Sequence, residues 1–160
     1  MAKPSPRNPA PRNVAPRNLA LVGATTLLHA LADQAWRGEV LALDAGRGGD
    51  DVSYGEDRVL PVEALDTADL AGVDVVIHVG APRDAASVAK RAQAAGAWLI
   101  DASGIYALDP SVPLILHGVN DAVLDTLSPD KKIIAVPHAL AGALSLALNP
   151  LHQAAMLKTV

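Results

Sequence analysis

The fold is decided by a short apolar run that ends in a glycine and leads into helical sequence, Leu19-Ala20-Leu21-Val22-Gly23-Ala24-Thr25. Such a run bounded by glycine is typical of a buried strand that enters a tight turn. A similar change recurs at residues 73–79, a β-branched run between Gly72 and Gly80 that also precedes helical sequence. Alternation of this kind predicts an α/β protein.

Outward from these two runs, the chain divides into alternating strands and helices. We expect strands at residues 19–22, 39–44, 58–60 (an edge strand), 73–79, 98–100, 114–116 and 133–136. We expect helices at residues 26–36, 84–95, 120–127 and 138–148. Asp84 is the expected N-cap of the second helix, and Gly96 the expected end. This order predicts a Rossmann-like fold, a mostly parallel sheet with helices on both faces, over residues 19–160.

The composition narrows the classes of protein further. Apolar residues make up 51% of the chain, yet aromatic residues make up 2% and cysteine is absent. A core of Ala, Val, Leu and Ile suits a buried parallel sheet. Without cysteine, disulfides, thiolate metal ligands and cysteine nucleophiles are excluded, and the five histidines show no metal-binding spacing, so we expect no metal. The apolar runs are too short to span a bilayer, so we expect a cytoplasmic protein without a membrane partner.

Residues 1–18 differ in character from the rest of the chain. They repeat Pro-Arg-Asn three times and carry a charge of +4, whereas the remainder carries −8. Proline at this density blocks helices and sheet ladders, so residues 1–18 are expected to form a disordered arm. The arm is either a partner-binding tail or a leader without a ligand. The acidic remainder is unsuited to nucleic acid, and no nucleic-acid partner is expected.

A candidate cofactor site lies at the predicted strand ends. The turn Gly23-Ala24-Thr25-Thr26 would bring backbone N–H groups to a pyrophosphate. Asp44 either accepts the ribose hydroxyls or is an ordinary solvated acid, and Arg47 either meets a 2′-phosphate or is solvated. Gly80, which follows the predicted strand at residues 73–79, is the last of the candidate cofactor-binding residues.

Two positions in this turn weaken the dinucleotide pattern. Thr26 and His29 stand where the pattern has its second and third glycines. Side chains there crowd the approach of the pyrophosphate and the packing of helix on strand. We therefore expect weak binding of NAD or NADP, or none, with NAD preferred because Asp44 repels a 2′-phosphate.

The run at residues 19–25 is followed by further segments, at residues 66–74, 94–101, 109–114, 119–120 and 148–152. Together they resemble the N-terminal, NAD(P)-binding domain of the aspartate-semialdehyde dehydrogenases, especially their Usg-type relatives. The resemblance covers Leu19 to Val160. N-acetyl-glutamyl-phosphate reductase is the alternative family, which shares a segment like Asp101–Tyr106 but fits the later sequence less well. The resemblance implies a first domain that binds NADP and supplies a nucleophilic cysteine, and a second, substrate-binding domain expected to begin where this chain stops.

Several positions that the family uses for chemistry hold other residues here. The resemblance places the nucleophilic cysteine at Ala139, a glutamine at Ala143, the substrate-binding arginine at Ala107, and Pro-Glu at His117-Gly118. The first helix is also about one and a half turns shorter than the family pattern. His138 is interpreted either as a neutral base or as a side chain that fills a vacated pocket. No catalytic residue is therefore expected.

Two hypotheses follow. The first is a catalytically inactive dinucleotide-binding-type domain, a pseudoenzyme, that acts as a structural or partner-binding protein, alone or as a homo-oligomer. The second is a subunit or fragment of an NAD(P)-dependent oxidoreductase that another chain completes.

Overall fold

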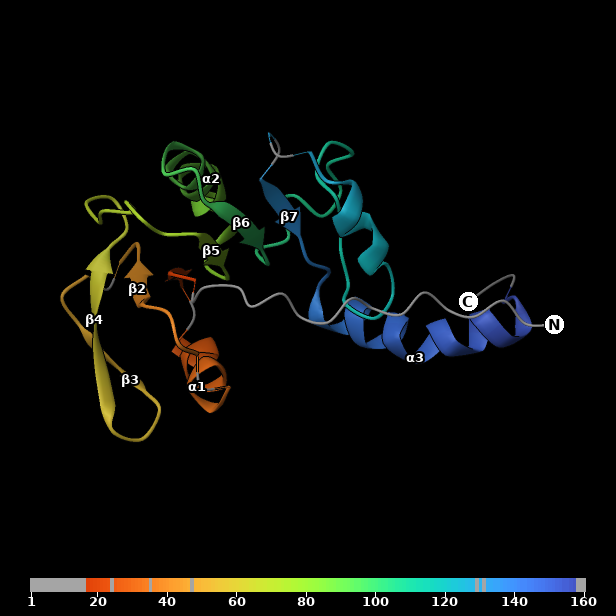
Figure 1. Ribbon diagram of the computed structural model, residues 1–160, viewed down its shortest axis with the longest axis horizontal. Helices are drawn as coiled ribbons and strands as arrows, with labels where there is room; N and C mark the ends of the chain where they lie inside the picture. The colour runs from red at the N-terminus through yellow and green to blue at the C-terminus, as the bar shows by residue number, and fades with distance from the viewer. Residues whose placement is uncertain are drawn as a thin grey trace.

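The computed structural model describes residues 17–23, 25–34, 36–46, 48–128, 130 and 132–157. Seven strands form one sheet in the order β3-β4-β2-β1-β5-β6-β7 (Figure 1). The strands are β1 (Leu19–Val22), β2 (Val40–Asp44), β3 (Asp51–Tyr54), β4 (Arg58–Ala64), β5 (Val75–His78), β6 (Trp98–Asp101) and β7 (Ile133–Ala135). The helices are α1 (Thr25–Asp33), α2 (Ala85–Ala94) and α3 (Ala139–Ala155), with 3-10 helices at Pro82–Asp84 and Asp121–Thr126. The predicted α/β class is confirmed.

Helices cover both faces of the sheet because strand side chains alternate between them. On one face, Leu28 of α1 packs with Leu21 and Ala42. On the other face, Val88 of α2 packs in a cluster with Leu99 and other strand residues. All pairings except β3 with β4 are parallel, as the strand–helix alternation predicted.

The region between β2 and β5 differs from the prediction. The expected edge strand at residues 58–60 is the start of the longer β4, which pairs in parallel with β2. The edge is formed instead by β3, which we did not expect, in an antiparallel hairpin with β4. In β3 only Val52 and Tyr54 are buried, and an alternation this short is hard to tell from a loop.

Four smaller expectations were wrong in part. Asp84 is the N-cap residue of α2, as expected, but it has helical backbone angles and makes no side-chain cap bond, because a 3-10 helix precedes α2. The expected strand at residues 114–116 is reduced to one bridge between Leu114 and Ala135. The third expected helix is a 3-10 helix, and the last continues through Pro150 to Ala155.

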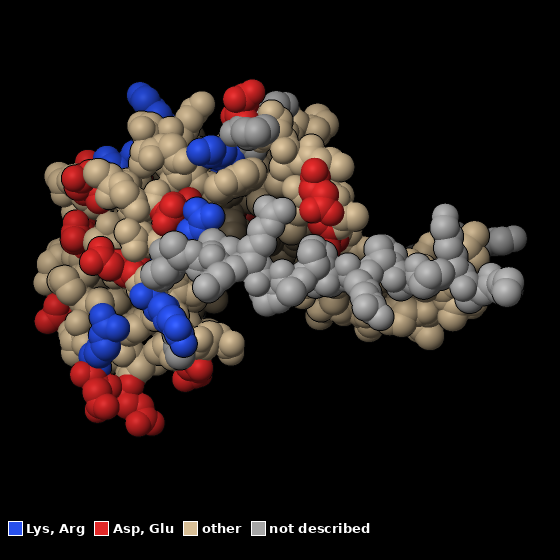
Figure 2. All heavy atoms as spheres, in the orientation of Figure 1, with Lys and Arg blue, Asp and Glu red and all other residues tan. Residues whose placement is uncertain are grey.

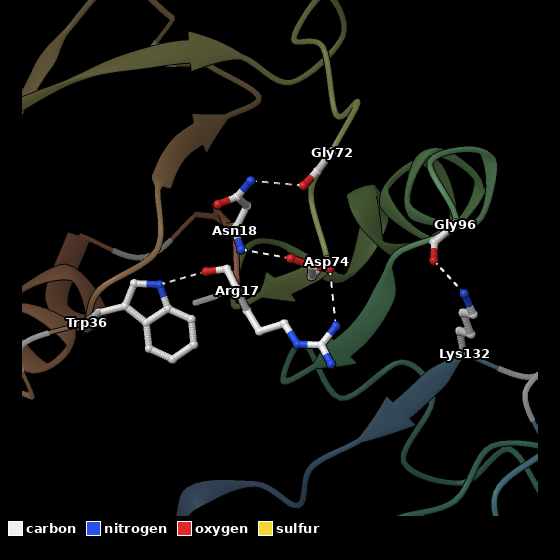
Figure 3. A network of polar contacts seen from close by, with 7 residues as sticks. All are labelled: Arg17, Asn18, Trp36, Gly72, Asp74, Gly96 and Lys132. Atoms are coloured by element: carbon white, nitrogen blue, oxygen red, sulfur yellow. Dashed lines mark hydrogen bonds and ion pairs between the residues drawn. The ribbon is translucent and has the colours of Figure 1, made fainter. Parts of the chain in front are cut away.

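Arg17 and Asn18 anchor the start of β1 at the amino edge of the sheet (Figure 3). The Asn18 backbone N–H donates to Asp74 Oδ2 at 2.9 Å, and its side-chain amide donates to the Gly72 carbonyl at 3.1 Å. The Trp36 indole donates to the Arg17 carbonyl at 3.0 Å, while the Arg17 guanidinium lies 3.2 Å from Asp74 Oδ1. The bond from Asn18, with the Arg17 charge as a lesser cause, lowers the pKa of Asp74.

The expected arm, residues 1–18, therefore overlaps the folded part of the chain by two residues. Arg17 and Asn18 belong to the domain built around the sheet (the sheet domain). Their polar groups connect the start of β1 to residues 36–39 and to residues 72–74. Residues 1–16 lie outside the described part of the chain.

The long helix α3 extends away from the sheet (Figure 1). Within α3, whose residues are all described, Gly142 alone is buried. Charged side chains gather over the sheet domain, whereas residues 139–155 carry none (Figure 2). Over the described residues, no helix combines the length and apolarity needed to cross a membrane.

Candidate functional site

The topology places a crevice at the carboxyl ends of β1 and β5. Strand β1 pairs with β2 on one side and with β5 on the other. Successive strands are therefore added on one side of β1 up to β4 and on its other side from β5 onward, so the strand order reverses at β1. Ligands of doubly wound sheets bind at such a switch point, beyond the carboxyl ends of the strands. Gly23 follows β1 there, and Gly80 follows β5 shortly after.

The two glycines meet more closely than other residues could. Gly23 has a φ of +81°, and a Cβ atom on it would lie 2.4 Å from the Cα of Gly80. Both the backbone conformation and the contact therefore require glycine at position 23. The result is a bare stretch of backbone at the switch point, which a phosphate group can approach closely.

A cavity of 530 Å³ opens beside the glycine pair. Its walls come from the ends of β1 and β2, from the loops after β4 and β5, and from the start of α2. The lining residues are Val22, Gly23, Asp44, Ala45, Gly46, Leu65, Asp66, Gly80, Ala81, Arg83, Asp84 and Ser87. Three of the predicted cofactor residues, Gly23, Asp44 and Gly80, thus line one cavity.

The remaining predicted residues are placed as follows. Thr25 and Thr26 form the first two positions of α1. Ala24 and Arg47 lie outside the described residues. Asp44 ends β2, where its Oδ1 accepts a hydrogen bond of 2.8 Å from the Gly46 N–H. One carboxylate oxygen of Asp44 therefore orders the loop.

The cavity is acidic. The carboxylates of Asp44, Asp66 and Asp84 line it together with the Arg83 guanidinium, whose Nε lies 3.8 Å from Asp84 Oδ1. We did not assign Asp66, Arg83 or Asp84 to the site from the sequence. The rule that ligands bind at strand ends could have suggested them, since they follow the ends of β4 and β5. Excess negative charge disfavours a ligand with an additional phosphate.

A dinucleotide fits the switch point by its backbone features. The Gly23–Gly80 contact leaves a cradle that a Cβ atom would fill. Helix α1 begins at Thr25, just beyond it, and the first N–H groups of a helix have no partner within the helix. Asp44 stands at the end of the next strand, where a ribose is recognised in such folds.

A polar cluster lies at the carboxyl ends of β5 and β6. His78 Nδ1 and Asp101 Oδ1 are 2.8 Å apart, and both side chains are fully buried. The Ser103 hydroxyl donates to the same carboxylate. Burial, followed by the negative charges of Asp101 and Asp109, raises the pKa of Tyr106. We had considered His78 only as a metal ligand, although its place at a strand end beside Asp101 could have signalled this pair.

The position that the resemblance gives to the nucleophile is the first residue of α3. Ala139 is exposed there, and its methyl group offers no lone pair. His138 precedes it as the N-cap, with Nδ1 accepting a hydrogen bond of 3.3 Å from the Leu140 N–H. The histidine therefore caps the helix, a role that neither of our two interpretations included.

Comparison with known proteins agrees with this geometry. Residues 18–127 match the family described as "Semialdehyde dehydrogenase, NAD binding domain". Aspartate-semialdehyde dehydrogenase from Rickettsia conorii is 29% identical over 150 residues, which cover 89% of this chain and 44% of the relative. The Streptomyces akiyoshiensis enzyme is 34% identical over 100 residues, covering 62% of this chain and 29% of the relative.

The fold is shared with solved structures of the same enzymes. Aspartate semialdehyde dehydrogenase II from Vibrio cholerae superimposes with a TM-score of 0.77 at 24% identity, covering 86% of this chain and 46% of that one. This chain thus spans less than half the length of these relatives. With its switch-point glycines and a family match over more than half its length, the chain belongs to the semialdehyde dehydrogenase NAD-binding domain family.

Proposed function

We propose that this chain is a dinucleotide-binding domain that lacks the aldehyde-oxidising step of its relatives and associates with another protein chain through α3. One feature carries the proposal: α3 begins at Ala139, in the place of the nucleophile, and exposes apolar side chains along its length. Alanine at position 139 cannot act as the nucleophile of the aldehyde step, and the exposed apolar side chains of α3 would supply a surface for association.

The binding part of the proposal rests on the switch point. The backbone at Gly23 and Gly80 would hold the pyrophosphate, and the Asp44 carboxylate would accept hydrogen bonds from the adenosine ribose. A bound nicotinamide cofactor supplies hydride transfer. In the relatives' mechanism a cysteine thiolate must first attack the aldehyde carbon, and this chain has no cysteine at any position.

The association part rests on which side of α3 is covered. Gly142 and Asn149 face the loop at residues 116–118, and the Asn149 amide donates to the Gly118 carbonyl at 3.4 Å. Leu146 lies on the same side but is still 48% exposed. The opposite stripe is left open. It consists of Leu140, Leu144, Ala147 and Leu151, whose leucines are 65%, 53% and 56% exposed.

We propose a second copy of this chain as the occupant of the stripe. The spacing of four, three and four residues places these side chains on one helix face, as in a two-helix seam. A two-fold axis would set the stripe against itself, and because residues 139–155 carry no charge, no like charges would meet.

Calorimetric titration and an activity assay test the binding part. We expect weak binding of both cofactors, with NAD tighter than NADP, and no NADP-dependent oxidation of aspartate semialdehyde in the presence of phosphate. Ala139→Cys alone should not restore turnover. Turnover that scales with purified protein, or submicromolar NADP binding, would instead favour a subunit of an active oxidoreductase.

Sedimentation across a concentration series tests the association part. We expect a dimer that Leu144→Glu converts to a monomer, because the charge would be buried in the seam. Leu108→Glu is the matched control, since Leu108 is 95% exposed and lies outside α3. A wild-type chain that is monomeric at every concentration would rule out the second copy and leave a different chain as the partner.

A further inference from the structure

The buried pair His78 and Asp101 has no role in the function proposed above. The two residues end β5 and β6 and lie opposite each other in the parallel register. Both are 0% exposed. The Ser103 hydroxyl lies 2.9 and 3.0 Å from the two oxygens of the same carboxylate, so Asp101 is held from two sides.

The carboxylate determines which nitrogen of His78 carries the proton. A carboxylate without a proton only accepts hydrogen bonds, so we assign the N–H of the imidazole to the partner nitrogen, Nδ1. In the neutral ring the lone pair is then on Nε2. This atom is buried and has no hydrogen-bond partner among the described residues. A buried acceptor without a donor is uncommon and points to a donor from outside the fold.

The Nε2 atom of His78 lies close to Gly80, one of the two cradle glycines. A Cβ atom on Gly80 would lie 3.0 Å from Nε2 and 3.7 Å from the Cα of Gly23. Gly80 also lines the cavity at the switch point. The His78 ring itself does not line the cavity, and the Gly80 backbone separates its Nε2 from the crevice.

The place of His78 in the sheet indicates which part of a ligand it would meet. A dinucleotide lies across the switch point, with its pyrophosphate at the reversal of strand order. Asp44 stands on the β2 side, where the adenosine would lie. His78 stands on the β5 and β6 side, where the second nucleoside would lie.

We propose that His78 Nε2 accepts a hydrogen bond from a ribosyl hydroxyl of the second nucleoside, with Asp101 and Ser103 as positioning residues. The inference rests on the dinucleotide binding proposed above. Because Nε2 is enclosed, the proposal requires the Gly80 backbone to shift when the ligand binds, and a glycine carries no side chain to oppose that shift. A hydroxyl suits this site because a lone pair attracts a donor and repels an anion.

Two variants separate the lone pair from the rest of the cluster. His78→Asn places an amide N–H near the position of Nδ1, keeping the bond to Asp101, but removes the acceptor. Asp101→Asn keeps the ring but donates an N–H to Nδ1, which moves the proton to Nε2. The matched control is His117→Asn, because His117 also pairs with an aspartate, Asp121 at 3.1 Å, but has a 98% exposed side chain.

Calorimetric titration with NAD and with ADP measures how much each variant weakens the binding of each ligand. ADP ends at the pyrophosphate and lacks the second nucleoside. We expect both cluster variants to lose about five- to tenfold in NAD affinity, the worth of one hydrogen bond, with ADP affinity unchanged. His117→Asn should match the wild type for both ligands. Nitrogen NMR of His78 should find the proton on Nδ1 in the wild type and on Nε2 in Asp101→Asn.

Each other outcome contradicts the proposal in a distinct way. Equal losses for NAD and ADP would show that the cluster only supports the cradle, and unchanged NAD affinity in a folded His78→Asn would exclude the contact. If the wild-type chain binds ADP as tightly as NAD, the second nucleoside adds no affinity. The contact with His78 would then be excluded, whereas the proposed nucleotide site at the glycine pair would stand. If the wild-type chain binds neither ligand, both the His78 contact and the proposed dinucleotide binding would be excluded. Thermal unfolding identifies a misfolded variant, and if Asp101→Asn misfolds, His78→Asn decides alone.

Discussion

Strand β1 and helix α3 are both apolar and uncharged, yet the structure treats them in opposite ways. Every residue of β1 is at most 2% exposed, because strands lie on both sides of it and side chains cover both faces. In α3, Gly142 alone is buried. The comparison teaches that apolar sequence alone does not determine burial: neighbouring strands and helices enclose β1, whereas α3 leaves most of its apolar side chains exposed.

The difference also divides the proposed functions. The ligand crevice belongs to the self-contained sheet domain, and the surface for association belongs to the helix. Substitutions in the sheet should therefore change the stability of the isolated chain. Substitutions on the open face of α3 should change association and leave that stability nearly unaltered.

The largest expected effect comes from one substitution made in each region. Leu99 in β6 is 1% exposed and Leu144 in α3 is 53% exposed. Leu99→Ala should lower the free energy of unfolding by about 3 kcal/mol through lost burial and a cavity. Leu144→Ala should change it by less than about 0.5 kcal/mol at concentrations where the chain is monomeric. Urea unfolding measures the free energy of unfolding of both variants. Equal losses would contradict the difference in burial between β6 and α3.

The second prediction concerns the glycine pair. Gly23→Ala should destabilise the chain by about 2–3 kcal/mol and abolish binding of NAD and ADP, because its Cβ would lie 2.4 Å from Gly80 Cα at a positive φ. Gly49→Ala is the control. It shares a positive φ, +93°, but its Cβ would meet nothing within 4 Å, so it should cost about 1 kcal/mol. Retention of nucleotide binding by Gly23→Ala would contradict the cradle.

A smaller effect is expected at the amino edge of the sheet. Asn18→Ala removes the bond to the Gly72 carbonyl and the bond accepted from the Glu39 N–H. The loss should be about 1–2 kcal/mol, seen as a lower Tm. Asn13→Ala, in the preceding Pro-Arg-Asn triplet, should leave Tm unchanged. If the two variants behave alike, the third triplet does not anchor the sheet as its contacts indicate.

The fourth prediction sharpens the choice of ligand within the crevice. Asp44→Asn should reduce the preference for NAD over NADP by about tenfold, because a carboxylate repels the 2′-phosphate and an amide does not. Calorimetric titration of both cofactors measures the ratio. Asp57→Asn, a surface change outside the cavity, is the control. A ratio unaffected by Asp44→Asn would place the adenosine ribose elsewhere.

The smallest effect is a pH dependence at Asp74. Its pKa is lowered in the folded chain by the Asn18 N–H and, to a lesser degree, by Arg17. A lowered pKa stabilises the folded state at pH values above the unfolded pKa, and that stabilisation is lost as the pH falls through the folded pKa. Asp74→Asn should therefore flatten the acid side of the stability profile. An acid limb identical to that of the wild type would show that Asp74 contributes nothing.

Local sequence was sufficient for the central sheet and for part of the crevice. β1, β2, β5 and β6 were predicted because their apolar runs are bounded by turn residues, and Gly23, Asp44 and Gly80 because they lie at the carboxyl ends of β1, β2 and β5. The hairpin of β3 and β4 was not predicted, because β3 buries only two side chains. Asp84 was predicted correctly as the N-cap residue of α2, but the 3-10 helix before α2 was not predicted, and the Asp84 side chain makes no cap bond.

By itself the sequence determined the α/β class, the glycine turn after the first strand, and the lack of any cysteine nucleophile. These properties depend on residue type and on spacing over a few positions. Only the tertiary structure decided that His78 faces Asp101, that loops after β4 and β5 share a cavity with Asp44, and that α3 is open while β1 is enclosed. Contact and burial depend on neighbours distant in the chain, which the sheet register brings together, and no local pattern specifies that register.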